Sequence, residues 1–122
     1  MASDIFMKID GIDGESADAK HKGEIDVLAW SVGATNSGSM AYGGGGGTGK
    51  VAFQDLSITK RIDKSSPKMM EKCANGTHIK KAVLVARKHG GQQMDYVKIT
   101  LSDLLVSSIS MSGSGDDSET VS

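Results

Sequence analysis

The stretch HIKKAVLVARKHGGQQMDYVKITLSDL, residues 78–104, decides the fold class of this chain. Residues 78–89 form one run that is typical of a β-strand, and residues 93–104 form a second run of the same kind. Gly90 and Gly91 lie between the two runs and are typical of a hairpin turn. The stretch therefore predicts two neighbouring strands joined as a hairpin.

The N-terminal residues predict a further strand before this hairpin. Ile5, Met7 and Ile9 occupy every second position, which is the period of a strand with one apolar face. This strand is expected to end at Gly11. Residues 11–22 are polar and contain glycine, and they predict a loop.

Two longer runs predict strands in the middle of the chain. Residues 24–34, EIDVLAWSVGA, are apolar on both faces, so we expect this strand to be covered on both sides over Val27 to Trp30. Residues 50–62, KVAFQDLSITKRI, predict another strand in which the apolar phase slips. A bulge or bend near Gln54 and Asp55 would explain the slip, because one extra residue exchanges the two faces.

One short helix is predicted, over about residues 66–75. Ser65 and Ser66 offer an N-cap hydroxyl, and Pro67 suits the first helical turn because its missing N–H costs nothing there. Asn75-Gly76 is expected to end the helix, with glycine in the left-handed position. Apolar residues at helical spacing predict the face that docks on the sheet, with the cysteine as a small core residue: Met69, Met70 and Cys73.

The order of these elements predicts a mainly β fold. Strands at short spacing with one helix are typical of a small antiparallel β-barrel or sandwich. Residues 105–112 continue the strand pattern, whereas residues 113–122 lack apolar periodicity and predict a tail. The 122-residue length fits a single domain over residues 1–122.

Charge and hydropathy exclude several kinds of partner. The net charge is −1, and the basic residues form short pairs rather than the stripe of a nucleic-acid binder. We expect these pairs, and the scattered carboxylates, to be solvated: Lys60-Arg61, Lys80-Lys81 and Arg87-Lys88. The N-terminus MASDIFMKID lacks the charge and apolar region of a signal peptide, and no apolar run is long enough for membrane insertion. Synthesis in the cytosol is therefore expected.

A glycine run raises the question of nucleotide binding. Residues 38–53, GSMAYGGGGGTGKVAF, contain G-x-x-x-x-G-K from Gly44 to Lys50. A phosphate-binding loop also needs Ser or Thr after the lysine and a helix beyond it, whereas Val51 and a strand follow here. Nucleotide binding is therefore not predicted.

The remaining residues predict neither an active site nor a metal site. The three histidines, His21, His78 and His89, lie far apart and lack metal-ligand spacing. We predict no enzymatic activity, no cofactor and no metal. Met40 and Tyr42, before five glycines that are costly to order, instead suit a surface that a neighbouring protein holds in place.

Several blocks in order resemble the Hcp family, the haemolysin-coregulated proteins of bacterial type VI secretion. The resemblance extends along essentially the whole chain. Its most specific blocks are DVLAWS (26–31), GGGGGTGK (43–50), QDLSITK (54–60), IDKSSP (62–67) and LLVSSIS (104–110).

The resemblance implies a structural role. A small β-barrel with one helix would assemble into homohexameric rings, and the rings would stack into the inner tube of the secretion machine. The tube would meet sheath and spike proteins, hold small effector proteins in its lumen, and leave the cytoplasm through the machine without a signal peptide.

The resemblance also implies roles for particular residues. The segment Ser37 to Lys50 matches the extended loop that reaches a neighbouring ring or subunit, and Ser31 is our prediction for a lumen-facing position. The residues assigned to this arm are Ser39, Met40, Tyr42, Gly43, Gly44, Gly45, Gly46, Gly47 and Lys50.

An alternative function remains open from the sequence. The family continues with further strands beyond the segment matching 112–122, so we expect a C-terminally truncated form. Missing strands would leave a sheet edge open to pairing with another chain. The alternative is a monomeric or loosely oligomeric secreted β-barrel that binds or chaperones a protein or small ligand.

Overall fold

The computed structural model describes residues 3–36, 51–88, 94–113 and 118–122. Within these ranges the chain forms ten strands and one helix, a mainly β fold as predicted. The elements in chain order are β1 Ser3–Ile9, β2 Ile25–Val27, β3 Ala29–Ser31, β4 Ala34–Asn36, β5 Val51–Phe53, β6 Ser57–Arg61, α1 Ser65–Asn75, β7 Ile79–Lys88, β8 Asp95–Leu104, β9 Ile109–Ser112 and β10 Ser118–Val121.

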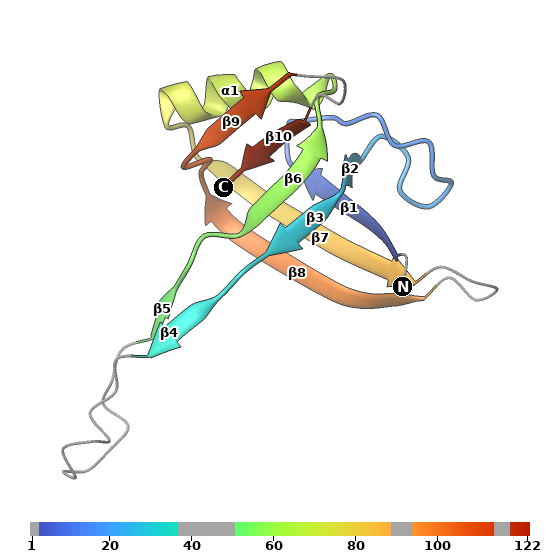
Figure 1. Ribbon diagram of the computed structural model, residues 1–122, viewed down its shortest axis with the longest axis horizontal. Coiled ribbons are helices and arrows are strands. Elements are labelled where there is room, and N and C mark those ends of the chain that lie inside the picture. Colours follow the sequence, from blue (N-terminus) through green and yellow to red (C-terminus); the bar gives the residue numbers. More distant parts are fainter. Residues whose placement is uncertain (1–2, 37–50, 89–93, 114–117) are drawn as a thin grey trace, which may run out of the picture.

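Two four-stranded sheets pack face to face (Figure 1). The first has the strand order β2-β1-β7-β8, the second has the order β3-β6-β10-β9, and all strand pairs are antiparallel. The core lies between them, because side chains from both sheets meet in one cluster, such as Leu84 on β7 and Ile58 on β6. Helix α1 lies beside β9 at one end of the sandwich.

The β7–β8 hairpin is the longest strand pair, and its two strands lie where the sequence predicted them. Ala82, Leu84 and Ala86 on β7 are fully buried toward the second sheet. Their partners on β8, Leu101, Ile99 and Val97, lie directly opposite them. Alternation with period two therefore aims one face of this hairpin into the core.

The predicted long strand 24–34 is in fact divided among β2, β3 and β4. At Leu28 the chain leaves the first sheet and enters the second, and the Leu28 N–H donates to the Thr59 carbonyl at 2.7 Å. Leu28 is 52% exposed, so the expectation of cover on both faces over Val27 to Trp30 was wrong at this residue. Val32, beyond that range, is also exposed. The backbone changes direction here, and among the described residues no second layer covers the outward side chain of Leu28.

The predicted strand 50–62 is likewise interrupted. β5 ends at Phe53 and β6 begins at Ser57, so the irregularity lies where the phase slip predicted it. The Gln54 N–H donates to the Gly33 carbonyl at 2.8 Å, which keeps this segment beside the chain that leads to β4. The break separates β5, outside the sandwich, from β6, inside it.

Helix α1 begins one residue earlier than predicted and has a different cap. The N-cap residue is Lys64, whose side chain makes no capping hydrogen bond. Asp63 precedes it: its Oδ1 accepts from the Ser65 N–H at 2.9 Å, and its own N–H donates to Ser66 Oγ at 3.0 Å. This reciprocal pair resembles a capping box. Gly76 ends the helix in the left-handed conformation, as predicted, with φ of 64°.

One face of α1 docks on the core. Met69 is 1% exposed and Cys73 is partly buried against the core cluster, as predicted for both. Met70 is 42% exposed, so the predicted stripe is narrower than three residues. The helix therefore contributes one large side chain to the core.

The segment predicted as a tail contains β10, which lies between β6 and β9 in the second sheet. Glu119 and Val121 point inward and are buried. β10 is four residues long, and its inward face carries one acid and one valine. Such a short strand has no apolar periodicity in the sequence. The prediction of a tail was wrong for this reason.

Candidate functional site

The predicted arm residues lie outside the described part of the chain; these are Ser39, Met40, Tyr42, Gly43, Gly44, Gly45, Gly46, Gly47 and Lys50. The structure does show the ribbon that leads to them, formed by β4 and β5. Their register pairs Ala34 with Phe53 and Thr35 with Ala52. The ribbon projects away from the two packed sheets (Figure 1).

The ribbon has little support of its own. Ala34, Thr35, Asn36 and Ala52 are exposed, and Phe53 is 80% exposed. An isolated two-stranded ribbon is marginally stable in water, and a large exposed aromatic side chain is typical of an interface. Leu28 and Val32 add exposed apolar surface on the chain that leads to β4. The ribbon and its approach therefore form a candidate contact surface.

Ser31 lies on β3 with its side chain on the outward face of the second sheet. It is exposed, and its neighbour Trp30 is opposite Ile58 and packs on the core instead. Hydroxyl side chains occupy most outward positions around it, namely Ser57 and Thr59 on β6, Ser118 and Thr120 on β10, and Ser110 and Ser112 on β9. The charged residue at these outward positions is Arg61. This face is therefore polar and nearly uncharged.

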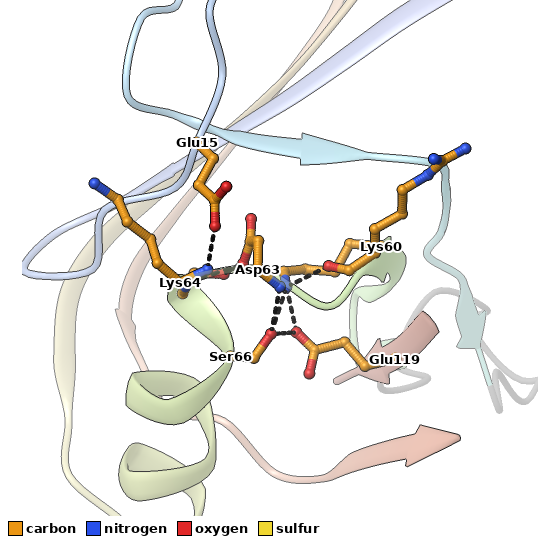
Figure 2. Close-up of polar contacts among 8 residues, drawn as sticks. Glu15, Lys60, Asp63, Lys64, Ser66 and Glu119 are labelled. Atoms are coloured by element: carbon orange, nitrogen blue, oxygen red, sulfur yellow. Dashed lines mark hydrogen bonds and ion pairs between the residues drawn. The ribbon is translucent and has the colours of Figure 1, made fainter. Parts of the chain in front are cut away.

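A buried polar network ties β10 to β6 and to the start of α1 (Figure 2). The Lys60 ammonium is fully buried and forms an ion pair with Glu119 Oε1. It also donates to Asp63 Oδ1 at 3.0 Å, to Ser66 Oγ at 3.1 Å and to the Arg61 carbonyl at 3.0 Å. Ser66 in turn donates to Glu119 Oε1 at 2.7 Å.

Two expectations of solvated charge were therefore wrong. Lys60 and Glu119 are both buried, and each compensates the charge of the other. The sequence contained one indication of this burial. Residues two positions apart in a strand share a face, so Lys60 lies on the same face as buried Ile58, and Glu119 lies on the same face as buried Val121. A buried ion pair adds little net stability, because removing both charges from water offsets their attraction. Its main effect is to specify which two groups must pair in the fold.

Arg87 is a third buried charge and anchors the loop between β1 and β2. Its guanidinium donates to both carboxylate oxygens of Asp18, at 2.7 and 3.0 Å, and to Asp4 Oδ2 at 3.0 Å. It also lies 5.1 Å from the centre of the Phe6 ring. The expectation that Arg87 is solvated was wrong, while Lys80 and Lys81 are exposed as expected.

These contacts shift two pKa values. Hydrogen bonds from Arg87 lower the pKa of Asp18 to about 2, against its ordinary value of 3.8. Hydrogen bonds to Asp18 and then to Asp4 raise the pKa of Arg87. Both groups are therefore charged at neutral pH and hold the loop as an ion pair.

The described residues contain no group of three potential metal ligands. His78 Nδ1 lies 2.9 Å from Asp103 Oδ1, with both side chains exposed. Strand β5 follows Lys50 directly, where a phosphate-binding loop would need a helix. No helix in the described ranges is long and apolar enough to cross a membrane.

Comparisons with known proteins identify the family. The family model described as "Type VI secretion system effector, Hcp" matches residues 6–122. Hcp1 of Pseudomonas aeruginosa is 56% identical over 118 residues, which are 96% of this chain and 73% of that protein.

Solved structures agree with this match. The crystal structure of Hcp1 from Salmonella typhimurium has a TM-score of 0.84 and 46% identity, covering 99% of this chain and 80% of that one. A type VI secretion system effector from Yersinia pestis has a TM-score of 0.81 and 35% identity, covering 97% and 81%. Proteins of this family are secreted, structural components rather than enzymes. This chain belongs to the Hcp family of type VI secretion system proteins.

Proposed function

We propose that this protein is the subunit of homohexameric rings that stack into the inner tube of a type VI secretion system. The observation that carries this proposal is the β4–β5 ribbon, which projects from the sandwich with all of its described side chains exposed, Phe53 among them. Such a ribbon gains support when a second copy covers it. Family membership supports the same function.

The proposed contact is between unlike surfaces of two copies. The ribbon is a projection on one side of the subunit, so it fits a different part of its neighbour rather than another ribbon. Contacts of this head-to-tail kind produce a closed ring when the rotation between copies closes, and a filament when it does not. Residues Ser37 to Lys50 would extend the same contact to a neighbouring subunit or ring.

We propose that Ser31 and the hydroxyl-rich outward face of the second sheet line the lumen. An uncharged polar wall would let small effector proteins of differing charge enter the ring without strong electrostatic trapping. The proposal can be tested with Ser31→Cys in a Cys73→Ser background, labelled with a heavy-atom cluster and imaged by electron microscopy. Label inside the ring supports it, and label on the outer rim contradicts it. Ser102→Cys on the outward face of β8 is the matched control.

The same function implies partners and a route. Sheath and spike proteins of the type VI machine would contact the assembled tube, and no nucleic acid or membrane insertion is involved. The rings would assemble in the cytoplasm, and the protein would leave through the machine without a signal peptide. Recovery of the protein in culture medium from a strain with an intact machine, and its loss when the sheath is deleted, tests this route.

The assembly contact is tested with ribbon variants. Phe53→Ser, or replacement of Gly43 to Gly47 by bulky residues, should preserve the far-ultraviolet circular dichroism spectrum and reduce ring or stack formation on a sizing column. Met70→Ser removes an exposed apolar side chain from α1 instead and is the matched control. Unchanged assembly of both ribbon variants would remove the proposed role of the ribbon.

A second candidate function rests on a cavity. A space of about 360 Å³ opens between the sheets and is lined mainly by apolar side chains, including Leu56, Leu101, Leu104, Leu105 and Val106. A cavity of this size and character suits a small apolar ligand. This favours the alternative, a secreted binding module. A rise in melting temperature with an apolar probe such as an anilinonaphthalene dye, in a chain that stays monomeric, would support the alternative over the tube.

A further inference from the structure

A second hollow lies on the outward face of the first sheet, on the side opposite the core. Its volume is about 280 Å³. We refer to it as the lysine hollow, and it is lined by Lys8, His21, Glu24, Lys81, Val83, Val85, Asp95, Lys98 and Thr100.

The strand register brings three lysines around an apolar floor. Val83 and Val85 point outward on β7, the central strand of this region, because the fully buried residues between and beside them point inward. Lys8 lies opposite Val83 on β1, Lys98 lies opposite Val85 on β8, and Lys81 is two residues before Val83 on β7. With strands about 4.8 Å apart, the three ammonium groups surround the two valines.

The loop between β1 and β2 provides a fixed wall for the hollow. The His21 ring stacks on Phe6 at a centroid distance of 4.3 Å, and Arg87 holds Asp18 through two hydrogen bonds. Backbone bonds close the loop on itself, from the Gly14 N–H to the Gly23 carbonyl at 2.8 Å and from the Ser16 N–H to the Glu24 carbonyl at 2.9 Å. The hollow therefore exists before any ligand binds, which lowers the entropic cost of binding.

The charges of the lysine hollow are not balanced internally. Glu24 accepts from His21 at 3.0 Å, and the backbone of Asp95 lies opposite Arg87 at the far end of the hollow. The side-chain ammonium groups of Lys8, Lys81 and Lys98 form no hydrogen bond or ion pair with any residue in the described ranges. Three exposed cations beside an apolar floor attract a ligand that carries both carboxylates and an apolar group.

We propose that the lysine hollow binds an acidic segment of a partner protein, with carboxylates that meet the three lysines and an apolar side chain that rests chiefly on Val83, because Val85 is 7% exposed. A polypeptide fits better than a nucleic acid, because Glu24 and Asp95 interrupt the positive surface that a continuous phosphate backbone needs, whereas a peptide can place its carboxylates only at the lysines. It also fits better than a small inorganic anion, which would leave the half-buried side chain of Val83 uncovered. All of its lining residues belong to one subunit.

Binding is measured by fluorescence anisotropy of a dye-labelled peptide, Glu-Val-Glu-Val-Glu, added to the full chain. The peptide Gln-Val-Gln-Val-Gln is the uncharged comparison. In the triple variant Lys8→Gln/Lys81→Gln/Lys98→Gln we expect binding to weaken by about tenfold or more, as expected for the loss of three exposed charge contacts. The triple variant Lys64→Gln/Lys68→Gln/Lys80→Gln makes the same charge change on exposed lysines elsewhere, and should retain binding within about threefold.

Acetylation of lysines followed by mass spectrometry then locates the peptide. The acidic peptide should protect Lys8, Lys81 and Lys98 from acetylation and leave Lys68 reactive. Three results would each overturn the proposal. The peptide could bind equally weakly to both triple variants, the uncharged peptide could bind as well as the acidic one, or inorganic phosphate at the peptide's own concentration could displace the peptide completely. Neither triple variant removes a buried side chain, so loss of folding does not confuse the result.

Discussion

Replacement of Lys60 by methionine tests how the C-terminal strand is held in the second sheet. In the folded protein the Lys60 ammonium compensates the fully buried Glu119 carboxylate and contacts Asp63 and Ser66 at 3.0 and 3.1 Å. Methionine fills a similar volume but leaves the carboxylate buried without an opposite charge. The expected loss in the free energy of unfolding is about 3–5 kcal/mol. This is a large share of the roughly 5–15 kcal/mol that holds a typical domain together.

The double variant separates the charge from the packing. Glu119→Leu alone leaves the Lys60 ammonium buried with Asp63 as its remaining ion-pair partner, so it should cost less than Lys60→Met. Lys60→Met/Glu119→Leu removes both charges, so it should be at least about 2 kcal/mol more stable than the sum of the two single losses predicts.

Urea unfolding at one fixed protein concentration provides the measurement, because assembly makes apparent stability depend on concentration. Fluorescence of Trp30, the single tryptophan, reports the transition, since its side chain packs against the core. A loss below about 1 kcal/mol in Lys60→Met would refute the reasoning, and so would simple additivity in the double variant.

Three further variants test other parts of the fold. Asp18→Asn should loosen the loop between β1 and β2, which would be measured as faster amide hydrogen exchange in that loop. In the unmodified protein the pKa of Asp18 is lowered, so its ion pair with Arg87 stabilises the fold above about pH 4, and this stabilisation is lost as the pH falls through about 2. Met69→Ala should cost about 2–5 kcal/mol in urea unfolding because the side chain is 1% exposed, whereas Met70→Ala should stay within about 0.5 kcal/mol. Gly14→Ala should lower the melting temperature because its Cβ would clash with the backbone just before β2, and an unchanged value would contradict this packing.

The sequence predicted the elements whose signal is local. The strands β7 and β8 have long alternating runs separated in the sequence by Gly90 and Gly91, and α1 has a proline at its start and Gly76 at its end. The division of residues 24–34 between two sheets could not be predicted, because both sheets accept the same alternating pattern. Its cause is tertiary: the chain turns at Leu28 to pair with β6.

Buried charges were the main error, and their cause is also tertiary. A lysine in a strand is ordinarily solvated, and Lys60 becomes buried because Glu119 on β10, Ser66 in α1 and Asp63 all contact its ammonium. Those contacts join residues up to 59 positions apart in the chain. The assembly residues were assigned through family resemblance, and local patterns alone predicted only that the glycine run is a contact rather than a phosphate site.

The mass of the protein in solution tests the central claim most directly. Light scattering on a sizing column, with negatively stained images of the peak, should give about six times the 12.7 kDa subunit mass and ring-shaped particles. A uniform monomer at concentrations well above those in a cell would contradict the account of this chain as a self-assembling tube subunit.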